Sequence, residues 1–491
     1  MPLILPGNVA SATASTTYDV DNSCRFFSDT SLHKDNGGSA TNRDKYTFSF
    51  WYKKCSNGVN QRILMISGSG TQGDGSDDYM TGYFKSDDTF RWQEYDGDIA
   101  TPAYSSQLVT SQKFRDNSAW YHFVLRFDST SGTADDRMRI YVNGTQVTSF
   151  GTRTNPDQNQ DGWFADDDGG IAIGGISDAF CNGYLAEVVG VDGQSLAPTE
   201  FGEFDEDSPT IWKPKDVSGI TLGNNGFYLD FEDSTNLGND ANGGTDFTEV
   251  NLAAADQSTD TCTNNFCTLN PVATSSGLGE SLTFSEGNCK IANTSDAAWE
   301  PAIGTMAVKA GKWYCEMKTT AAGAESYGVM DPVQYNEAMP TADDINSCSR
   351  SYTMYYSDGN ATSDDESTAW GEDYGTGDII SIAVDLDNMK LYMAKNGTWV
   401  ASGDPTSGAT GTGTHVYFGG SKDNTRAAGT DYYIFVCAIH NNSTSEVNFG
   451  GCPGFAISSG NADANGYGNF EYAVPSGYLA LCTKNLGSDG G

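Results

Sequence analysis

Basic residues, histidine and proline are scarce in this sequence. Its 491 residues include 27 Lys and Arg against 65 Asp and Glu, with a formal net charge of -38, only 4 His and only 14 Pro. A surface of this sign repels DNA, RNA and anionic membranes, so we expect no nucleic-acid partner. The acidity has three open interpretations: a merely solvated surface, a need for divalent cations, or a salty medium that screens the charges.

Long apolar runs are also missing. No stretch approaches the roughly 20 apolar residues that cross a bilayer, so we expect no membrane insertion. The amino terminus, Met1–Pro6, lacks the basic start and the apolar length of a signal peptide, so we do not expect export by the usual route. The Asn-Xaa-Thr triplets at Asn143 and Asn396 are therefore interpreted as turns and not as glycan acceptors.

The 11 cysteines form no zinc pattern, because no Cys-x-x-Cys pair or histidine partner accompanies them. An odd number also argues against a complete disulfide framework. Cys262 and Cys267 are the one close pair. They either bridge across a loop in an oxidising medium or pack as small apolar thiols, as isolated cysteines do by default.

Complete catalytic sets are absent from the sequence. There is no Gly-x-Ser-x-Gly elbow, phosphate-binding loop or zinc-histidine pair, and His122 falls inside an expected strand. A glycosidase needs two carboxylates across a cleft, roughly 5 to 10 Å apart. The segments Glu203–Asp207 and Tyr228–Glu232 are acidic, but neither has a third acid at the spacing used by jelly-roll glucanases. We predict that the protein is not an enzyme, with polysaccharide degradation as the alternative.

Alternating strand patterns are what the sequence has in abundance. In Gly377–Trp399, apolar residues recur at every second position on both sides of Asp387-Asn388, which suits a two-residue turn. A second turn follows at Asn396-Gly397. Trp120–Val147 repeats this plan and turns at Asn143-Gly144. With 57 Gly, 25 Tyr and 24 Phe, the composition predicts an all-β protein of two tandem β-sandwich domains with helix limited to short turns.

The first half resembles the laminin-G-like, concanavalin A-like jelly rolls. The resemblance covers about residues 20–205 and is carried by Tyr46–Tyr52, Trp120–Phe123, Arg139–Gly144 and Gly183–Val188, in that order. Ser195–Phe201 is similar to the short helical connector that follows the last of these strands.

The second half, residues 271–491, resembles the SPRY domain. Gly311–Met317 contains the Lys-Trp-Tyr-x-Glu strand of that family, with Trp313 and Glu316 in place. Tyr374–Ile380 matches its Gly-Asp entry to the central strand, and Tyr327–Met330, Val416–Gly419, Tyr432–Val436 and Val447–Gly450 complete the set. Between the halves we expect a joint at residues 206–270, whose strands either finish the first sandwich or pack between the two.

The ends of the chain resemble the laminin-G-like plus SPRY-like structural proteins of marine bacteriophages. Leu5–Ala12, Thr259–Pro271 and Pro475–Leu486 carry this likeness. It implies a non-catalytic component of the virion, a tail or head fibre that binds host-surface glycan or neighbouring virion subunits and is a homo-oligomer. A capsid-decorating protein without host binding is the alternative. Residues 1–19 would be a docking segment, in which Leu3, Ile4 and Leu5 either dock on a neighbouring subunit or add an edge strand to the first domain.

Two acidic loops are candidates for Ca²⁺, which prefers oxygen ligands on turns. One contains Asp74, Asp77 and Asp78, and the other contains Asp166, Asp167 and Asp168. Jelly rolls of the kind that the first half resembles often hold such an ion near their sugar site. Solvated loop tips are the simpler interpretation.

Three tryptophans adjoin Gly/Asp-rich segments and are candidate sugar contacts, because carbohydrate sites use aromatic faces near loops. They are Trp92, Trp163 and Trp370. The alternative for each is that it caps the end of a sandwich.

Overall fold

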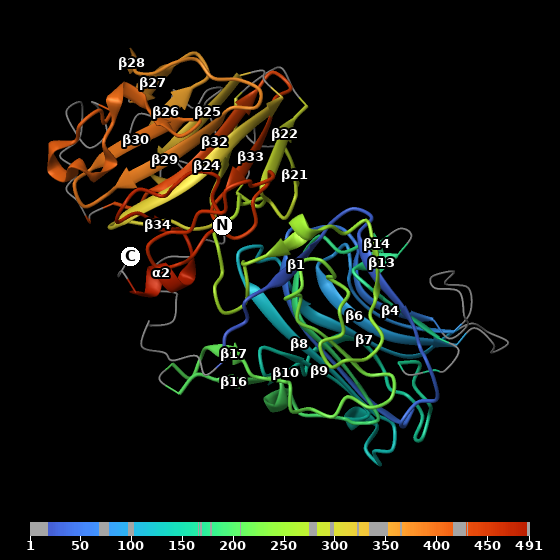
Figure 1. The fold of residues 1–491 in the computed structure, drawn as a ribbon. Coiled ribbons are helices and arrows are strands. Elements are labelled where there is room, and N and C mark those ends of the chain that lie inside the picture. The colour runs from blue at the N-terminus through green and yellow to red at the C-terminus, as the bar shows by residue number, and fades with distance from the viewer. Residues whose placement is uncertain are drawn as a thin grey trace. The chain divides into compact units, whose positions relative to one another are not determined.

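The computed structural model describes residues 18–67, 78–96, 103–164, 166, 169–176, 179–206, 208–273, 282–294, 299–321, 324–332, 352–363, 366–415, 429 and 431–488. The chain divides between Thr263 and Asn264 into two compact units, here called the N-terminal and C-terminal sandwiches. Each is built from β-sheets (Figure 1). The all-β prediction is confirmed. Among the described helices, none is long and apolar enough to cross a membrane.

The N-terminal sandwich has two eight-stranded sheets. One runs β10 (Thr145–Gln146), β9 (Met138–Val142), β8 (Trp120–Asp128), β3 (Lys45–Lys54), β15 (Gly183–Asp192), β1 (Ser23–Phe26) and β20 (Gln257–Ser258), with β18 (Phe227–Leu229) also paired to β15. The other runs β11 (Phe150–Thr154), β7 (Ala103–Lys113), β6 (Thr89–Asp96), β5 (Tyr79–Phe84), β4 (Gln61–Ser67), β12 (Gly170–Ile173), β2 (Ser31–Asp35) and β19 (Thr248–Val250). We call these the β15 sheet and the β5 sheet.

Short elements join these strands. They are the hairpins β13 (Gly175–Ile176) with β14 (Ala179–Phe180) and β16 (Gly202–Phe204) with β17 (Trp212–Pro214), and the 3-10 turns η2 (Ala134–Asp136), η3 (Pro198–Glu200) and η4 (Ala254–Asp256). The predicted helical connector is thus the single turn η3.

One apolar core lies between the two sheets of the N-terminal sandwich. Phe48 and Phe50 from β3 and Leu185 from β15 share it with Leu64 and Ile66 from β4, and all five are fully buried. Their period-two spacing is what places them on one face of each strand.

The C-terminal sandwich also has two sheets. The first runs β21 (Leu282–Ser285), β22 (Lys290–Asn293), β33 (Thr444–Asn448), β24 (Lys312–Ala321), β29 (Ile379–Asp385), β30 (Lys390–Lys395) and β31 (Thr398–Trp399), with β34 (Leu479–Ala480) parallel to β24. The second runs β23 (Glu300–Ile303), β32 (Ile434–His440), β25 (Ala324–Met330), β26 (Tyr352–Tyr356), β27 (Asn360–Ser363) and β28 (Glu366–Ala369). The turns η7 (Val400–Ser402) and η8 (Pro405–Thr410) and the helix α2 (Thr483–Ser488) complete it.

The hairpin turns follow the sequence closely, with one exception. Asn143-Gly144 and Asn396-Gly397 are two-residue turns in which both residues have positive φ, between 47° and 78°. Asp387-Asn388 is not such a turn. Asp385 pairs with Lys390, so four residues connect β29 to β30, and Met389 takes the left-handed conformation at φ 52°.

The predicted joint at 206–270 belongs mainly to the first sandwich. Strands β18, β19 and β20 pair with β15, β2 and β1 respectively. The first domain therefore extends to residue 263 and not to 205. Of the two predicted alternatives, these strands finish the first sandwich.

Cysteines in the described part of the chain are thiols. Cys262 and Cys267 are among them, so the bridge considered from their spacing is not formed. Val416–Gly419 of the SPRY-like pattern, and Leu3, Ile4 and Leu5, lie outside the described residues.

Candidate functional site

The outer face of the β15 sheet is covered by the chain itself. Phe201, Val217 and Leu222 from the segment that follows β15 pack on Val189 and Val191. Farther along the same sheet, Asp260 forms a buried ion pair with Lys53 at 2.6 Å and accepts the indole N–H of Trp120 at 3.1 Å. Within the described part of the chain, these side chains of the β15 sheet are therefore covered or paired.

The outer face of the β5 sheet is different in composition. Strand register places residues that pair across neighbouring strands on the same face. Tyr79 pairs with Tyr95, Thr81 with Gln93, and Tyr83 with both Arg62 and Arg91. We call this surface the Tyr–Arg face and define it by six outward-facing side chains: Arg62, Tyr79, Tyr83, Arg91, Gln93 and Tyr95. All except Gln93 are partly exposed.

Local sequence explains why these side chains point outward. In β6 the alternate residues Phe90, Trp92 and Glu94 are fully buried, which turns Arg91, Gln93 and Tyr95 to the other side. In β4 a bulge between Arg62 and Leu64 lets both Ile63 and Leu64 enter the core. Bulges re-aim side chains in this way, and here the bulge leaves Arg62 on the outer face.

An aromatic pair occupies one end of the Tyr–Arg face. The rings of Tyr79 and Tyr95 stack with centroids 4.9 Å apart and planes at 21°. Gln93 Nε2 donates to the Tyr79 hydroxyl at 3.1 Å. Flat aromatic surface beside an amide is the combination that sugar sites use, with C–H groups on the rings and hydroxyls on the polar atoms.

A cationic row occupies the other end, where Arg62, Tyr83 and Arg91 lie side by side on β4, β5 and β6. Arg91 Nη1 donates to the Tyr83 hydroxyl at 2.8 Å, and the guanidinium lies 5.6 Å from the centre of the Tyr83 ring. The same nitrogen also donates to Gln93 Oε1 at 3.4 Å. These contacts hold the guanidinium in one orientation and link the row to the aromatic pair.

The two acidic loops predicted to bind Ca²⁺ start and end at the same edge of the β5 sheet. Ser67, which ends β4, pairs with Gly170 at the start of β12 and with Tyr79 at the start of β5. Asp78 precedes Tyr79 and Asp166 lies four residues before Gly170. Separate segments of sequence therefore meet beside the aromatic pair.

Asp166 already has a cationic partner. Its carboxylate lies 2.7 Å from Arg43 Nη2, and its backbone carbonyl accepts Asn36 Nδ2 at 2.6 Å. Among the described residues, no three His, Cys, Asp or Glu side chains come together as metal ligands. Asp74, Asp77, Asp167 and Asp168 lie outside the described residues, so the calcium site stays a prediction.

Trp163 lies at this edge as well. The Arg43 guanidinium sits 5.2 Å from the centre of the indole, which is partly buried against the core. The Trp163 backbone N–H donates to Glu94 at 3.1 Å, and Tyr46 donates to the same carboxyl group. Burial raises the pKa of Glu94 to about 7. Trp163 is therefore partly exposed and held in place by these contacts, and its role as a sugar contact stays a prediction.

Trp92 is wrong as a sugar contact. It points into the core from β6 and is fully buried, with its ring edge against Tyr46 at 6.1 Å. The prediction relied on the Gly/Asp-rich sequence near Trp92. The direction of the side chain is instead set by the position of Trp92 in β6.

Trp370, in the C-terminal sandwich, is partly buried by its own unit. Its indole N–H donates to the Gly413 carbonyl at 3.3 Å, and its ring packs edge-on against Tyr355 and His415. These contacts favour the alternative role of a cap, and Trp370 as a sugar contact stays a prediction.

His122 has the wrong tautomer for a catalytic base. Trp212 Nε1, which can only donate, lies 2.9 Å from His122 Nδ1, so the proton of the neutral ring is on Nε2. Nε2 then donates to Ser49 Oγ at 2.8 Å and cannot take its proton. Burial lowers the pKa of His122 to about 3, which keeps the ring neutral.

Four of the acids considered for hydrolysis are among the described residues, and they do not face one another across a cleft. Asp230 accepts the backbone N–H of Glu232 at 3.1 Å, so the two belong to one turn. Glu203 and Asp205 both lie within 3.5 Å of Lys213 Nζ. Neither arrangement has the opposed geometry that glycoside hydrolysis needs.

The Tyr–Arg face itself was missed at the sequence level. The period-two alternation of Phe90–Gln93, which places Arg91 and Gln93 on one side of the strand, is the signal that the sequence contains. The cross-strand register that stacks Tyr79 on Tyr95 is not readable from one strand.

Comparison with known proteins bears on the first half. A sequence profile described as the concanavalin A-like lectin/glucanases superfamily matches residues 28–193. A search of curated proteins returned no match.

Solved structures are similar to parts of the chain. A heptameric SAP-like pentraxin from Limulus polyphemus is 16% identical over 37% of this chain and 80% of its own, with a TM-score of 0.26. A candidate carbohydrate binding protein from Bacteroides ovatus is 16% identical over 48% and 59%, with a TM-score of 0.32. The SPRY domain of human HERC1 is 14% identical over 36% and 96%, with a TM-score of 0.26. At these TM-scores the similarities do not bear on what this chain binds.

Proposed function

We propose that this protein is a non-catalytic carbohydrate-binding component of a bacteriophage virion, and that its N-terminal sandwich holds a glycan on the Tyr–Arg face. The observation that carries the glycan part is the stacked pair Tyr79–Tyr95 with Gln93 bonded to it, partly exposed on a rigid sheet. A platform fixed by backbone pairing loses little entropy when it binds. The superfamily profile over residues 28–193 supports the same class of ligand.

The absence of catalysis is supported by the arrangement of polar groups. His122 cannot act as a base toward Ser49, and the acids near Asp230 lie in one turn. The virion location is supported by the resemblance of Leu5–Ala12, Thr259–Pro271 and Pro475–Leu486 to phage structural proteins. A homo-oligomeric, fibre-like protein on the outside of the particle is the form this role takes.

Binding of host-surface polysaccharide by the purified full chain tests the glycan part. Tyr95→Ala should weaken binding roughly tenfold, because it removes one ring of the stack. Phe204→Ala is the matched control, since Phe204 is 44% exposed and lies on β16, away from the Tyr–Arg face. Melting curves establish that both variants fold.

Equal affinity of wild type and Tyr95→Ala would contradict the proposed face. Protein that binds no host polysaccharide but is present in purified particles would favour the capsid-decorating alternative. Release of reducing sugar that is abolished by Asp230→Asn or Glu232→Gln would overturn the non-catalytic assignment.

A further inference from the structure

The charge on the Tyr–Arg face is opposite to that of the whole protein. The chain has a net charge of -38. Yet among the described outward-facing side chains of β4, β5 and β6, the charged ones are the two arginines, Arg62 and Arg91. With 65 acidic against 27 basic residues in the chain, surface composition alone favours carboxylates over guanidinium groups at such positions.

We infer that the ligand of this face is an anionic polysaccharide, whose carboxylate or sulfate groups bind Arg62 and Arg91. This inference rests on the proposed glycan-binding function and adds the chemical class of the sugar. Guanidinium groups bind carboxylate and sulfate through paired N–H donors, so arginine is suited to such groups in a way that lysine is not.

The spacing of the row fits a linear polymer. Arg62 and Arg91 flank Tyr83 on adjacent strands, so they are two strand spacings apart, about 10 Å. Tyr79 and Tyr83 are four residues apart on β5, which is about 13 Å along the strand. A chain of several sugars can therefore stack one ring on the Tyr79–Tyr95 pair and present acidic groups to the arginines.

The acidic edge of the sheet does not compete with this row. Asp78 and Asp166 adjoin the Tyr79 end of the strands, whereas the arginines lie in the Tyr83 row. Asp166 is also neutralised by Arg43 at 2.7 Å. The face is thus divided along β5 into an aromatic end near the acids and a cationic end away from them.

The negative charge of the chain as a whole allows specific binding of an acidic polymer to be distinguished from nonspecific adsorption. Long-range repulsion disfavours nonspecific adsorption of any polyanion, with a reach of about 10 Å at 0.1 M salt. Binding of an acidic polymer by this protein therefore requires a local cationic site.

Affinity for paired polymers tests the inference with the full chain. Polygalacturonate is compared with its carboxyl-reduced neutral form, and dextran sulfate is compared with dextran, which separates carboxylate from sulfate as the source of charge. We expect at least roughly tenfold tighter binding of one acidic polymer than of its neutral partner. Arg62→Gln and Arg91→Gln should each weaken binding of the acidic polymer about tenfold. Arg91→Lys should weaken it less than Arg91→Gln does.

Arg115→Gln is the control, because Arg115 is 59% exposed on the same sandwich but outside the Tyr–Arg face. The inference would be overturned if neutral polymers bound as tightly as acidic ones and if affinity fell in Tyr95→Ala but not in the arginine variants. The proposed function would then remain intact. Failure of all four polymers to bind would also overturn the inference, whereas the proposed function is tested separately by binding of host-surface polysaccharide. Equal loss in Arg115→Gln and Arg91→Gln would also overturn the inference, because it would show nonspecific charge attraction.

Discussion

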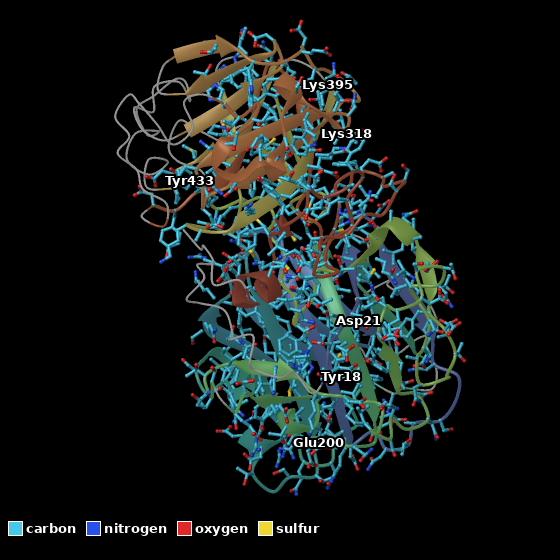
Figure 2. All side chains as sticks on the ribbon, turned by 60° about the vertical axis from the view of Figure 1, so that its left-hand side comes forward. Tyr18, Asp21, Glu200, Lys318, Lys395 and Tyr433 are labelled. Atoms are coloured by element: carbon cyan, nitrogen blue, oxygen red, sulfur yellow. The ribbon has the colours of Figure 1, made fainter. Side chains whose placement is uncertain are left out.

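The hydroxyl of Tyr228 lies 2.9 and 3.0 Å from the two carboxyl oxygens of Glu187. A second tyrosine, Tyr18, is labelled in Figure 2. Tyr18 approaches the same carboxyl group at 3.1 Å. Glu187 lies at a bulge in β15 with a left-handed φ of 50°, where β1 ends its pairing and β18 begins. The cluster therefore lies where β15 changes partner from β1 to β18, two strands that are more than 190 residues apart in sequence.

The buried Glu187 should make stability depend on pH. Burial, with further repulsion from Asp230 and Glu232, raises its pKa from 4.5 to about 8. Between these values the folded state keeps a proton that the unfolded state releases, so stability is fully present below about pH 4.5 and is lost as the pH rises through 8. Glu187→Gln should flatten this decline, because glutamine stays neutral and still accepts both tyrosine hydroxyls.

Melting temperatures of wild type and Glu187→Gln at pH 5, 6.5 and 8.5 check this. Glu94→Gln is the companion variant, since the pKa of Glu94 is also raised, to about 7, and acts in the same direction. An unchanged slope in Glu187→Gln would mean that Glu187 is ionised in the folded protein.

Much of the fold could be predicted because its signals are local. The turns Asn143-Gly144 and Asn396-Gly397 need positive φ, which asparagine and glycine adopt readily, and both turns form. The end of the first domain could not be predicted in the same way. Strands β18, β19 and β20 are only two or three residues long, and their partners β15, β2 and β1 are distant in sequence.

The candidate site shows the same division. Trp163 and the acidic loops could be selected as candidates from composition, and the structure places Asp78, Asp166 and Trp163 near one edge of the β5 sheet, but their binding roles stay predictions. The Tyr79–Tyr95 stack depends on register between strands, which no single strand encodes.

Glu316 should be essential for the C-terminal sandwich. It is fully buried on β24 and accepts hydrogen bonds from the backbone N–H groups of Glu471 at 2.9 Å and Tyr472 at 2.8 Å, and from Asn448 and Tyr314. Glu316→Gln leaves one acceptor oxygen for these donors, so we expect a loss of about 3 kcal/mol. Chemical denaturation measures it, with the exposed Glu372→Gln as control. A loss below about 0.5 kcal/mol would show that water replaces the carboxylate.

Calcium, if it binds the acidic edge, should stabilise the protein. A ligand that binds the folded state alone raises the melting temperature with concentration, so a chelator should lower it. Asp78→Asn should weaken this response, as should changes at Asp74, Asp77, Asp167 or Asp168. Asp166→Asn should lower the melting temperature with and without calcium, because it breaks the pair with Arg43. No effect of either calcium or chelator on wild type would identify these loops as solvated acid.

Deleting residues 1–8, which include Leu3, Ile4 and Leu5, should leave the protein folded but absent from purified particles. The chain is already fixed at its first described residues, because Tyr18 contacts Glu187 and the backbone of Val20 bonds to Thr263 Oγ1 at 3.1 and 3.0 Å. These bonds do not involve residues 1–8, so the melting temperature should change by less than about 2 °C, the shift that a fraction of a kcal/mol produces in a domain of this size.

Incorporation is measured by comparing the protein content of particles assembled with the truncated and complete chains, with Phe204→Ala as a full-length control. A large drop in melting temperature would instead show that this segment is an edge strand of the first domain. Normal folding with normal incorporation would remove the segment from any role in docking.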